Sequence, residues 1–219
     1  MELSKSIFSE KKVVIATHNP GKLKEFEALF SFYDFTVIGG KSLGLSEPEE
    51  TGTSFEENAY IKAYNAAKNL NIIALADDSG LSIEALGGEP GVYTADWCTN
   101  EKGLRDYDFC MKKIARALEE KGAHDIAQRR AQFTCVLCLA WPNGAAKYFR
   151  GEVFGTIVWP AQGEGGFGLD PIFKPIGYDK TFAQMHQEEK MKGAALKALS
   201  HRARAFDELR NFLDCLGRS

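Results

Sequence analysis

The stretch "NIIALADDSGLSIEALGG", residues 71–88, gives the clearest structural signal in the sequence. Its apolar run, residues 72–76, predicts a buried strand, and we expect the adjacent carboxylates Asp77 and Asp78 to end that strand. Two neighbouring carboxylates oppose each other's ionisation unless a cation, a proton or unusual exposure relieves the repulsion. Because strand ends in α/β sheets face ligand crevices, this stretch predicts a bound ligand.

Strands and helices alternate on both sides of this stretch. Before it, the apolar spacing predicts strands over residues 11–17 and 35–40 and helices over 20–33 and 55–70, the second helix capped by Thr53 or Ser54. After it, the sequence predicts a helix near 101–121, a hairpin of strands 130–141 and 145–159 around "PNG", and a helix over 197–217. This order predicts an α/β or α+β fold on a mixed sheet. With no repeat or linker, we expect one domain over residues 1–219, with residues 1–10 as a disordered extension.

The composition narrows the classes of protein. Hydrophobic residues make up 44% of the 219 residues and charged residues 26%, which is ordinary for a soluble globular protein. A net charge of −3 argues against a general nucleic-acid binder. No window is long enough for a membrane helix, and the N-terminus lacks a signal peptide. The five cysteines form no spaced framework, and Cys135 and Cys138 are expected to be buried thiols, so we expect a reducing cytoplasm.

The segment "ATHNPGKLKEF", residues 16–26, joins a strand to a helix. Thr17 and Asn19 lie in the turn, and Lys22 lies in the first helical turn. Backbone N–H groups at a helix N-terminus, the helix dipole and a lysine together suit an anion. The segment lacks the spacing of a P-loop, and taken alone an ordinary turn with a solvated lysine explains it better.

Acidic residues come from two segments. Glu47, Glu49 and Glu50 lie in a polar loop, whereas Asp77 and Asp78 follow the strand. Carboxylates from two segments suit Mg²⁺, which joins them to substrate phosphates, and one acid could act as general base. The loop acids alone are better explained as a solvated charged run, but the position of the two aspartates favours a function.

Two further segments could contact a base. In "GEGGFGLD", residues 163–170, glycines permit a close approach and Phe167 offers a flat face on which a purine can stack, although a tight loop explains the pattern equally well. In "SHRARAF", residues 200–206, Ser200 can cap a helix with His201 and Arg202 in its first turn. Cations there oppose the helix dipole unless an anion or an electron-rich base edge lies nearby, and a capped surface helix remains the alternative.

Together these segments resemble the Ham1/RdgB family of inosine/xanthosine triphosphate pyrophosphatases, from about residue 12 to about residue 207. The motifs, in chain order, are "THNPGK" (17–22), "EETGTSFEENAYIKA" (49–63), "ADDSGL" (76–81), "GGEPGVY" (87–93), "GGFGLDPIF" (165–173) and "EEK" with "SHRA" (188–190, 200–203). Any one motif is weak, but six in the same order are specific.

The resemblance implies a fold and an activity. The fold would be an elongated two-lobed α/β structure around a long mixed sheet with flanking helices, forming a homodimer with substrate in the cleft between lobes. The activity would be Mg²⁺-dependent hydrolysis of the purine nucleoside triphosphates ITP, dITP and XTP to the monophosphate and pyrophosphate. No nucleic-acid or membrane partner is expected.

The resemblance also assigns residues. Asp78 would accept the proton of the attacking water, and Glu49 and Asp78 would hold the metal. Substrate-binding roles fall on Thr17, His18, Asn19, Pro20, Gly21, Lys22, Lys62, Ser79, Phe167, Gly168, Leu169, Asp170, Lys190, His201 and Arg202. Leu169 stands where the family usually has tyrosine, and Asp96 where it has arginine. Because nine residues separate "EEK" from "SHR", Lys192 or Lys197 could replace Lys190 at the base.

Three other functions compete with this interpretation. A Maf-like pyrophosphatase would differ in its choice of nucleotide. An aspartate-nucleophile phosphotransferase would release orthophosphate, but its motif places the two acids two residues apart rather than adjacent. A nucleotide sensor would bind ITP without hydrolysing it.

Overall fold

The computed structural model describes residues 12–17, 19–31, 35–191 and 198–217. The chain divides into two compact units: the first comprises Met1–Asp78, Val136–Arg150 and Ala205–Ser219, and the second Ser79–Cys135 and Gly151–Arg204. Three strands, β3 (Ala74–Ile83), β5 (Arg130–Ala140) and β6 (Ala146–Ile157), and the helix α7 (His201–Gly217) contribute residues to both units. The expected disordered extension lies outside the described residues.

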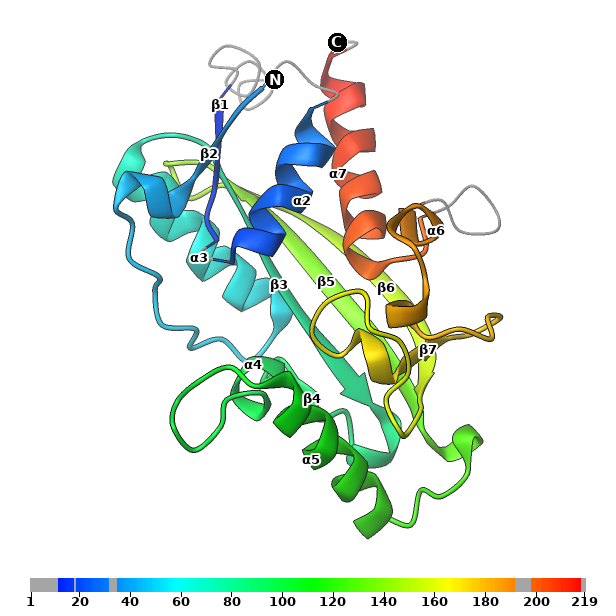
Figure 1. Cartoon of the computed structure of the whole chain (residues 1–219). Coiled ribbons are helices and arrows are strands. Elements are labelled where there is room, and N and C mark those ends of the chain that lie inside the picture. The colour runs from blue at the N-terminus through cyan, green and yellow to red at the C-terminus, as the bar shows by residue number, and fades with distance from the viewer. Residues whose placement is uncertain (1–11, 18, 32–34, 192–197, 218–219) are drawn as a thin grey trace. The chain divides into compact units, whose positions relative to one another are not determined.

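The sheet is mixed, as predicted. Its strands are hydrogen-bonded in the order β2-β1-β3-β5-β6-β7, and β4 pairs with β3 (Figure 1). β1 (Lys12–Ile15) runs parallel to both β2 (Thr36–Gly39) and β3, whereas β4 (Pro90–Gly91) and β7 (Phe173–Pro175) pair antiparallel with β3 and β6.

Helices accompany these strands in each unit. The first unit contains α2 (Pro20–Phe30), the short helix η1 (Gly40–Leu43) and α3 (Phe55–Leu70). The second contains α4 (Thr94–Trp97), α5 (Tyr107–Glu120) and α6 (Gln187–Met191), with the short helices η2 (Glu84–Leu86), η3 (Ile126–Gln128), η4 (Asp170–Ile172) and η5 (Phe182–Gln184). Among the described residues, no helix combines the length and apolar character needed to cross a membrane.

The predicted start of α3 is confirmed in detail. Ser54 is the N-cap: its side chain accepts the Glu57 N–H, and the Glu57 side chain accepts the Ser54 N–H in return. This reciprocal pair satisfies two helix-end donors and fixes the first residue of the helix. The buried face that follows includes Phe55, Ala59 and Ala63.

Two predictions about local structure were wrong. Asp77 and Asp78 do not end a strand, because β3 continues through them to Ile83. The five cysteines were expected to form no spaced framework and to lie in a reducing compartment, but Cys98 and Cys110 are joined by a disulfide that links the end of α4 to the first turn of α5. Cys135 and Cys138 are buried thiols, as predicted.

Candidate functional site

The turn between β1 and α2 is organised by its own side chains. The Thr17 hydroxyl accepts the Asn19 N–H at 3.2 Å, and the Asn19 side-chain oxygen accepts the Lys22 N–H at 3.3 Å. Pro20, whose fixed φ suits a first helical residue, opens α2, and Gly21 follows it. His18 lies outside the described residues. The turn therefore holds Lys22 at a helix N-terminus, where the dipole favours an anion.

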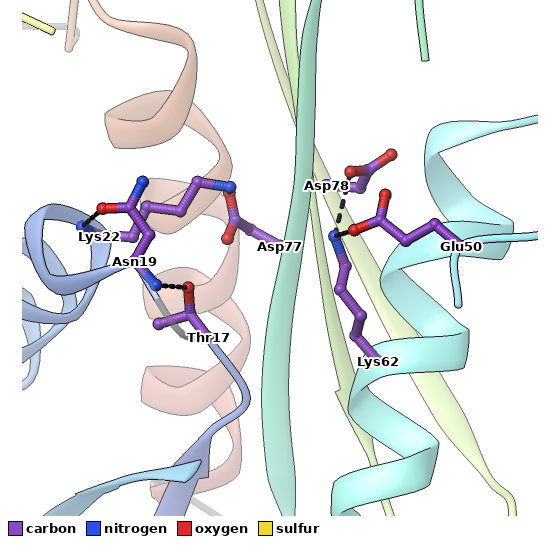
Figure 2. Close-up of polar contacts among 7 residues, drawn as sticks. All are labelled: Thr17, Asn19, Lys22, Glu50, Lys62, Asp77 and Asp78. Atoms are coloured by element: carbon purple, nitrogen blue, oxygen red, sulfur yellow. Dashed lines mark hydrogen bonds and ion pairs between the residues drawn. The ribbon is translucent and has the colours of Figure 1, made fainter. Parts of the chain in front are cut away.

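The two adjacent aspartates project to opposite sides of β3, since successive side chains of a strand alternate in direction (Figure 2). Asp77 pairs with Lys22, with 2.8 Å between its Oδ2 and the lysine Nζ. Asp78 pairs with Lys62 of α3, with 3.1 Å between its Oδ1 and the lysine Nζ. The expected repulsion between side-by-side acids is thus absent, because each carboxylate has its own lysine. Ser79 follows as the first residue of the second unit.

Lys62 bridges two carboxylates. Its Nζ lies 2.9 Å from Glu50 Oε1 as well as 3.1 Å from Asp78 Oδ1 (Figure 2). Burial lowers the pKa of Lys62, but the charges of Asp78, Asp77 and Glu50 outweigh this and raise the pKa above its usual value. Burial raises the pKa of Asp78 to about 6, helped by Glu50 and opposed by Lys62. Asp78 is therefore a buried carboxylate with a proton affinity suited to a general base near neutral pH.

This arrangement partly supports a binding site for a divalent cation. Asp78 Oδ2 is buried and has no hydrogen-bond partner among the described residues, so one oxygen of this carboxylate is available as a ligand. Glu49, the second predicted ligand, is exposed, whereas Glu50 pairs with Lys62, which in turn pairs with Asp78. Within the described part of the chain, no three His, Cys, Asp or Glu side chains cluster as a complete metal site. The donor set present suits an ion such as Mg²⁺, which keeps waters and takes ligands from substrate.

In the second unit, the glycine-dense loop presents an aromatic ring. Phe167 is 47% exposed, and its N–H donates to Asp170 Oδ2 at 3.0 Å. Lys190 is only 5% exposed and donates to the same Asp170 oxygen at 2.9 Å. Lys190 thus lies against Asp170, while Lys192 and Lys197 lie outside the described residues. Gly166 adopts a φ of 80°, and a Cβ there would lie 2.3 Å from Asp170 Oδ2, so glycine is required for this turn.

The start of α7 brings two more predicted residues into this unit. The Ser200 hydroxyl accepts the Ala203 N–H at 3.1 Å, which confirms the predicted cap. His201 and Arg202 are half-buried, and the His201 ring stacks on Phe133 with centroids 4.8 Å apart. The Leu169 side chain lies in the apolar core of the unit, so only its backbone is left to face a ligand.

One residue of this region gave no sequence signal. Tyr107, the first residue of α5, packs edge-on against Phe167 with ring centroids 5.3 Å apart. No motif includes Tyr107, and it precedes Phe167 by sixty positions, so only the folded chain reveals the contact.

Comparisons with known proteins agree with the motifs. The model of the Ham1 family matches residues 13–212. The chain is 57% identical over 197 residues to a dITP/XTP pyrophosphatase of Brucella melitensis, and the match covers 89% of this chain and 90% of the relative. It is 54% identical over 200 residues to a dITP/XTP pyrophosphatase of Mesorhizobium japonicum, and that match covers 90% of this chain and 91% of the relative.

Among solved structures, the Ham1 protein of Staphylococcus aureus superposes with a TM-score of 0.80 at 39% identity, covering 95% of this chain and all of that one. A HAM1 protein of Coxiella burnetii superposes with a TM-score of 0.82 at 34% identity, covering 93% and 98%. The family model spans most of the chain and these relatives are alike over most of both lengths, so the chain belongs to the Ham1 family.

Proposed function

We propose that this chain hydrolyses the deaminated purine nucleoside triphosphates ITP, dITP and XTP to the monophosphate and pyrophosphate. The observation that carries the proposal is the buried Asp78, whose pKa is raised to about 6 and whose carboxylate is held by Lys62 beside Glu50. This pattern supplies a base and fixed charges to a phosphoanhydride. Relatives in the same family are named dITP/XTP pyrophosphatases, which supports the choice of substrate.

The first unit would bind the triphosphate. Lys22 and the N–H groups at the start of α2 would contact phosphate oxygens, with Thr17 and Asn19 holding the turn in shape. Lys62 would neutralise charge that develops on the leaving pyrophosphate. Asp77 would keep Lys22 in place, since its carboxylate lies 2.8 Å from that ammonium group.

The proposal includes Mg²⁺ as cofactor. Asp78 and an acid of the 49–50 pair would hold the ion, and Glu50 is the member of that pair that the structure brings next to Asp78 through Lys62. When bound, the ion would supply a Lewis acid that polarises the phosphate at which water attacks. Asp78 would accept the proton of that water.

The second unit would recognise the base. Hypoxanthine and xanthine carry an oxygen at position 6, whereas adenine carries an amino group there. Arg202 donates hydrogen bonds but cannot accept them, so it pairs with the oxygen and is mismatched by the amino group. Phe167 would stack on the purine. Guanine shares the oxygen and would have to be rejected at its 2-amino group. By resemblance to the family, we further propose that the protein acts as a homodimer. We also propose a cytoplasmic location, as expected from the sequence, although a disulfide such as that between Cys98 and Cys110 is rare in that compartment.

The test is a product assay on the purified chain. Mg²⁺ would be added with ITP, XTP, ATP or GTP in separate reactions, and pyrophosphate and orthophosphate would be measured side by side. We expect pyrophosphate from ITP and XTP at rates far above those from ATP and GTP. Orthophosphate as the product would indicate a phosphotransferase or phosphatase, equal rates on all four nucleotides would refute base recognition, and binding of ITP without turnover would indicate a sensor.

A further inference from the structure

Phe167 is an exposed aromatic side chain that is nevertheless held from two directions. Its backbone is fixed by Asp170, which accepts the Phe167 N–H and is itself held by the buried Lys190. Its ring is held by Tyr107, at an interplanar angle of 69° and a centroid distance of 5.3 Å. Such an edge-to-face pair restricts rotation of the exposed ring.

Tyr107 has a firm anchor of its own. It opens α5, whose buried face continues through Cys110, Ile114 and Leu118. Asp106 caps the helix by accepting the Phe109 N–H at 2.9 Å, and the disulfide between Cys98 and Cys110 ties this first turn to the preceding segment. Tyr107 is therefore presented by a regular element rather than by a loop, which is the arrangement that gives a binding group a fixed position.

The same ring also borders the space beside Gly168. Gly168 has a φ of 66°, and a Cβ at that position would lie 3.4 Å from Tyr107 Cε1. A side chain at position 168 would therefore press against the Tyr107 ring. Burial raises the pKa of the Tyr107 hydroxyl, and the charges of Arg105 and Arg202 oppose this rise, so the tyrosine lies within electrostatic reach of the arginine that would bind the base.

We propose that Tyr107 is a positioning residue that determines base specificity, by holding the Phe167 ring in one orientation for a stacked 6-oxopurine. This inference rests on the proposed function. Stacking alone is tolerant of base identity, because every base has an aromatic face. Discrimination comes from donors at the base edge, and those donors can read position 6 only if the stacked base has one orientation. A pre-ordered ring also lowers the entropic cost of binding.

The experiment compares Tyr107→Ala and Tyr107→Phe with the parent chain. Loss of the ring contact should raise KM for ITP about five- to tenfold with little change in kcat, as expected for one aromatic pair. The ratio of kcat/KM for ITP to that for ATP should fall by a similar factor. Tyr107→Phe keeps the ring and should restore both values. Phe109→Ala, which removes an exposed ring from the same helical turn, is the matched control and should leave them unchanged.

Two readouts separate this role from a general loss of structure or of activity. Inhibition by inorganic tripolyphosphate, which lacks a base, should be the same in Tyr107→Ala and the parent. Calorimetric binding of inosine monophosphate, which needs no turnover, should weaken in Tyr107→Ala only. An unchanged ITP/ATP ratio together with unchanged inosine monophosphate binding would overturn the inference. The inference would also be overturned if Tyr107→Ala weakened inhibition by tripolyphosphate as much as it weakened binding of inosine monophosphate. If the parent chain binds inosine monophosphate but releases no pyrophosphate, the proposed function is refuted, whereas the inference about Tyr107 is not.

Discussion

Asp77 and Asp78 are neighbours in sequence but have different surroundings. Each pairs with a lysine from a different helix, Lys22 of α2 for Asp77 and Lys62 of α3 for Asp78. Strand alternation thus converts one acidic dipeptide into two separate ion pairs. The variants Asp77→Asn and Asp78→Asn are consequently matched. Each removes one charge from the same strand, but only Asp78→Asn removes the proposed base.

We expect Asp78→Asn to lower kcat for ITP by at least about 100-fold, because the amide cannot accept a proton. Asp77→Asn should act mainly on KM, by about tenfold or less, because it removes only the charge that holds Lys22. Steady-state pyrophosphate release measures both constants. A larger loss of kcat in Asp77→Asn than in Asp78→Asn would show that the roles of the two aspartates are reversed.

The titration of Asp78 is a second prediction at this scale. Its pKa of about 6 lies above the ordinary value of 3.8, so the stability that this carboxyl contributes is complete below pH 3.8 and is lost as the pH rises through about 6. In metal-free protein, the carboxyl ¹³C signal that is absent from Asp78→Asn should titrate near pH 6. Glu50→Gln removes a charge that raises this pKa and should shift the titration to lower pH. Lys62→Met should shift it to higher pH, and shifts in the same direction would contradict the arrangement of charges described here.

At the scale of single residues, the sequence identified types of residue better than their contacts. It singled out Asp78 and Lys22, because acids after an apolar run and a lysine after a turn are local patterns. It assigned Glu49 as a metal ligand through the family resemblance, whereas Glu50 is the residue that pairs with Lys62, since adjacent loop residues differ only in where the folded backbone directs them. It could not detect Tyr107, whose role depends on a tertiary contact with Phe167.

The capping box of α3 provides a prediction at the scale of an element. Ser54→Ala should lower the free energy of unfolding by about 1 kcal/mol, the usual cost of losing an N-cap. Urea denaturation followed by circular dichroism measures this change. Ser46→Ala, in the exposed loop before the helix, is the control and should have little effect. Equal stability of Ser54→Ala and the parent would indicate that Thr53, which also bonds to the Glu57 carboxylate, can replace the cap.

Elements with local signals were predictable and elements that depend on distant partners were not. The helix α3 and the hairpin of β5 and β6 match their predicted ranges closely, because caps and turn residues mark their ends. The strand β3 runs past its predicted end, since lysines from two helices neutralise the acids within it. The helix α5 begins at Tyr107 rather than near residue 101, because Asp106 caps it there and donates its N–H to the Cys98 carbonyl.

At the scale of the whole molecule, the chain crosses between the two units only within regular elements. The crossings fall between Asp78 and Ser79 in β3, within β5 and β6, and between Arg204 and Ala205 in α7. No flexible linker separates the units, although separately folding domains usually meet at such linkers. Unfolding of one unit would therefore remove backbone hydrogen bonds at the ends of strands that continue into the other.

We accordingly expect the two units to unfold in one cooperative transition, as the sequence-based prediction of a single domain requires. Tryptophan provides a separate probe of each unit, since Trp141 is in the first and Trp97 and Trp159 are in the second. A variant with Trp97→Phe and Trp159→Phe reports only on the first unit, and Trp141→Phe reports only on the second. In each variant, the urea midpoint from fluorescence should equal the midpoint from far-ultraviolet circular dichroism. Because both midpoints come from the same variant, any effect of the substitutions on stability cancels.

Fluorescence midpoints that fall below the circular dichroism midpoint in one variant and above it in the other would show that the units unfold independently. Continuous strands would then be insufficient to couple them.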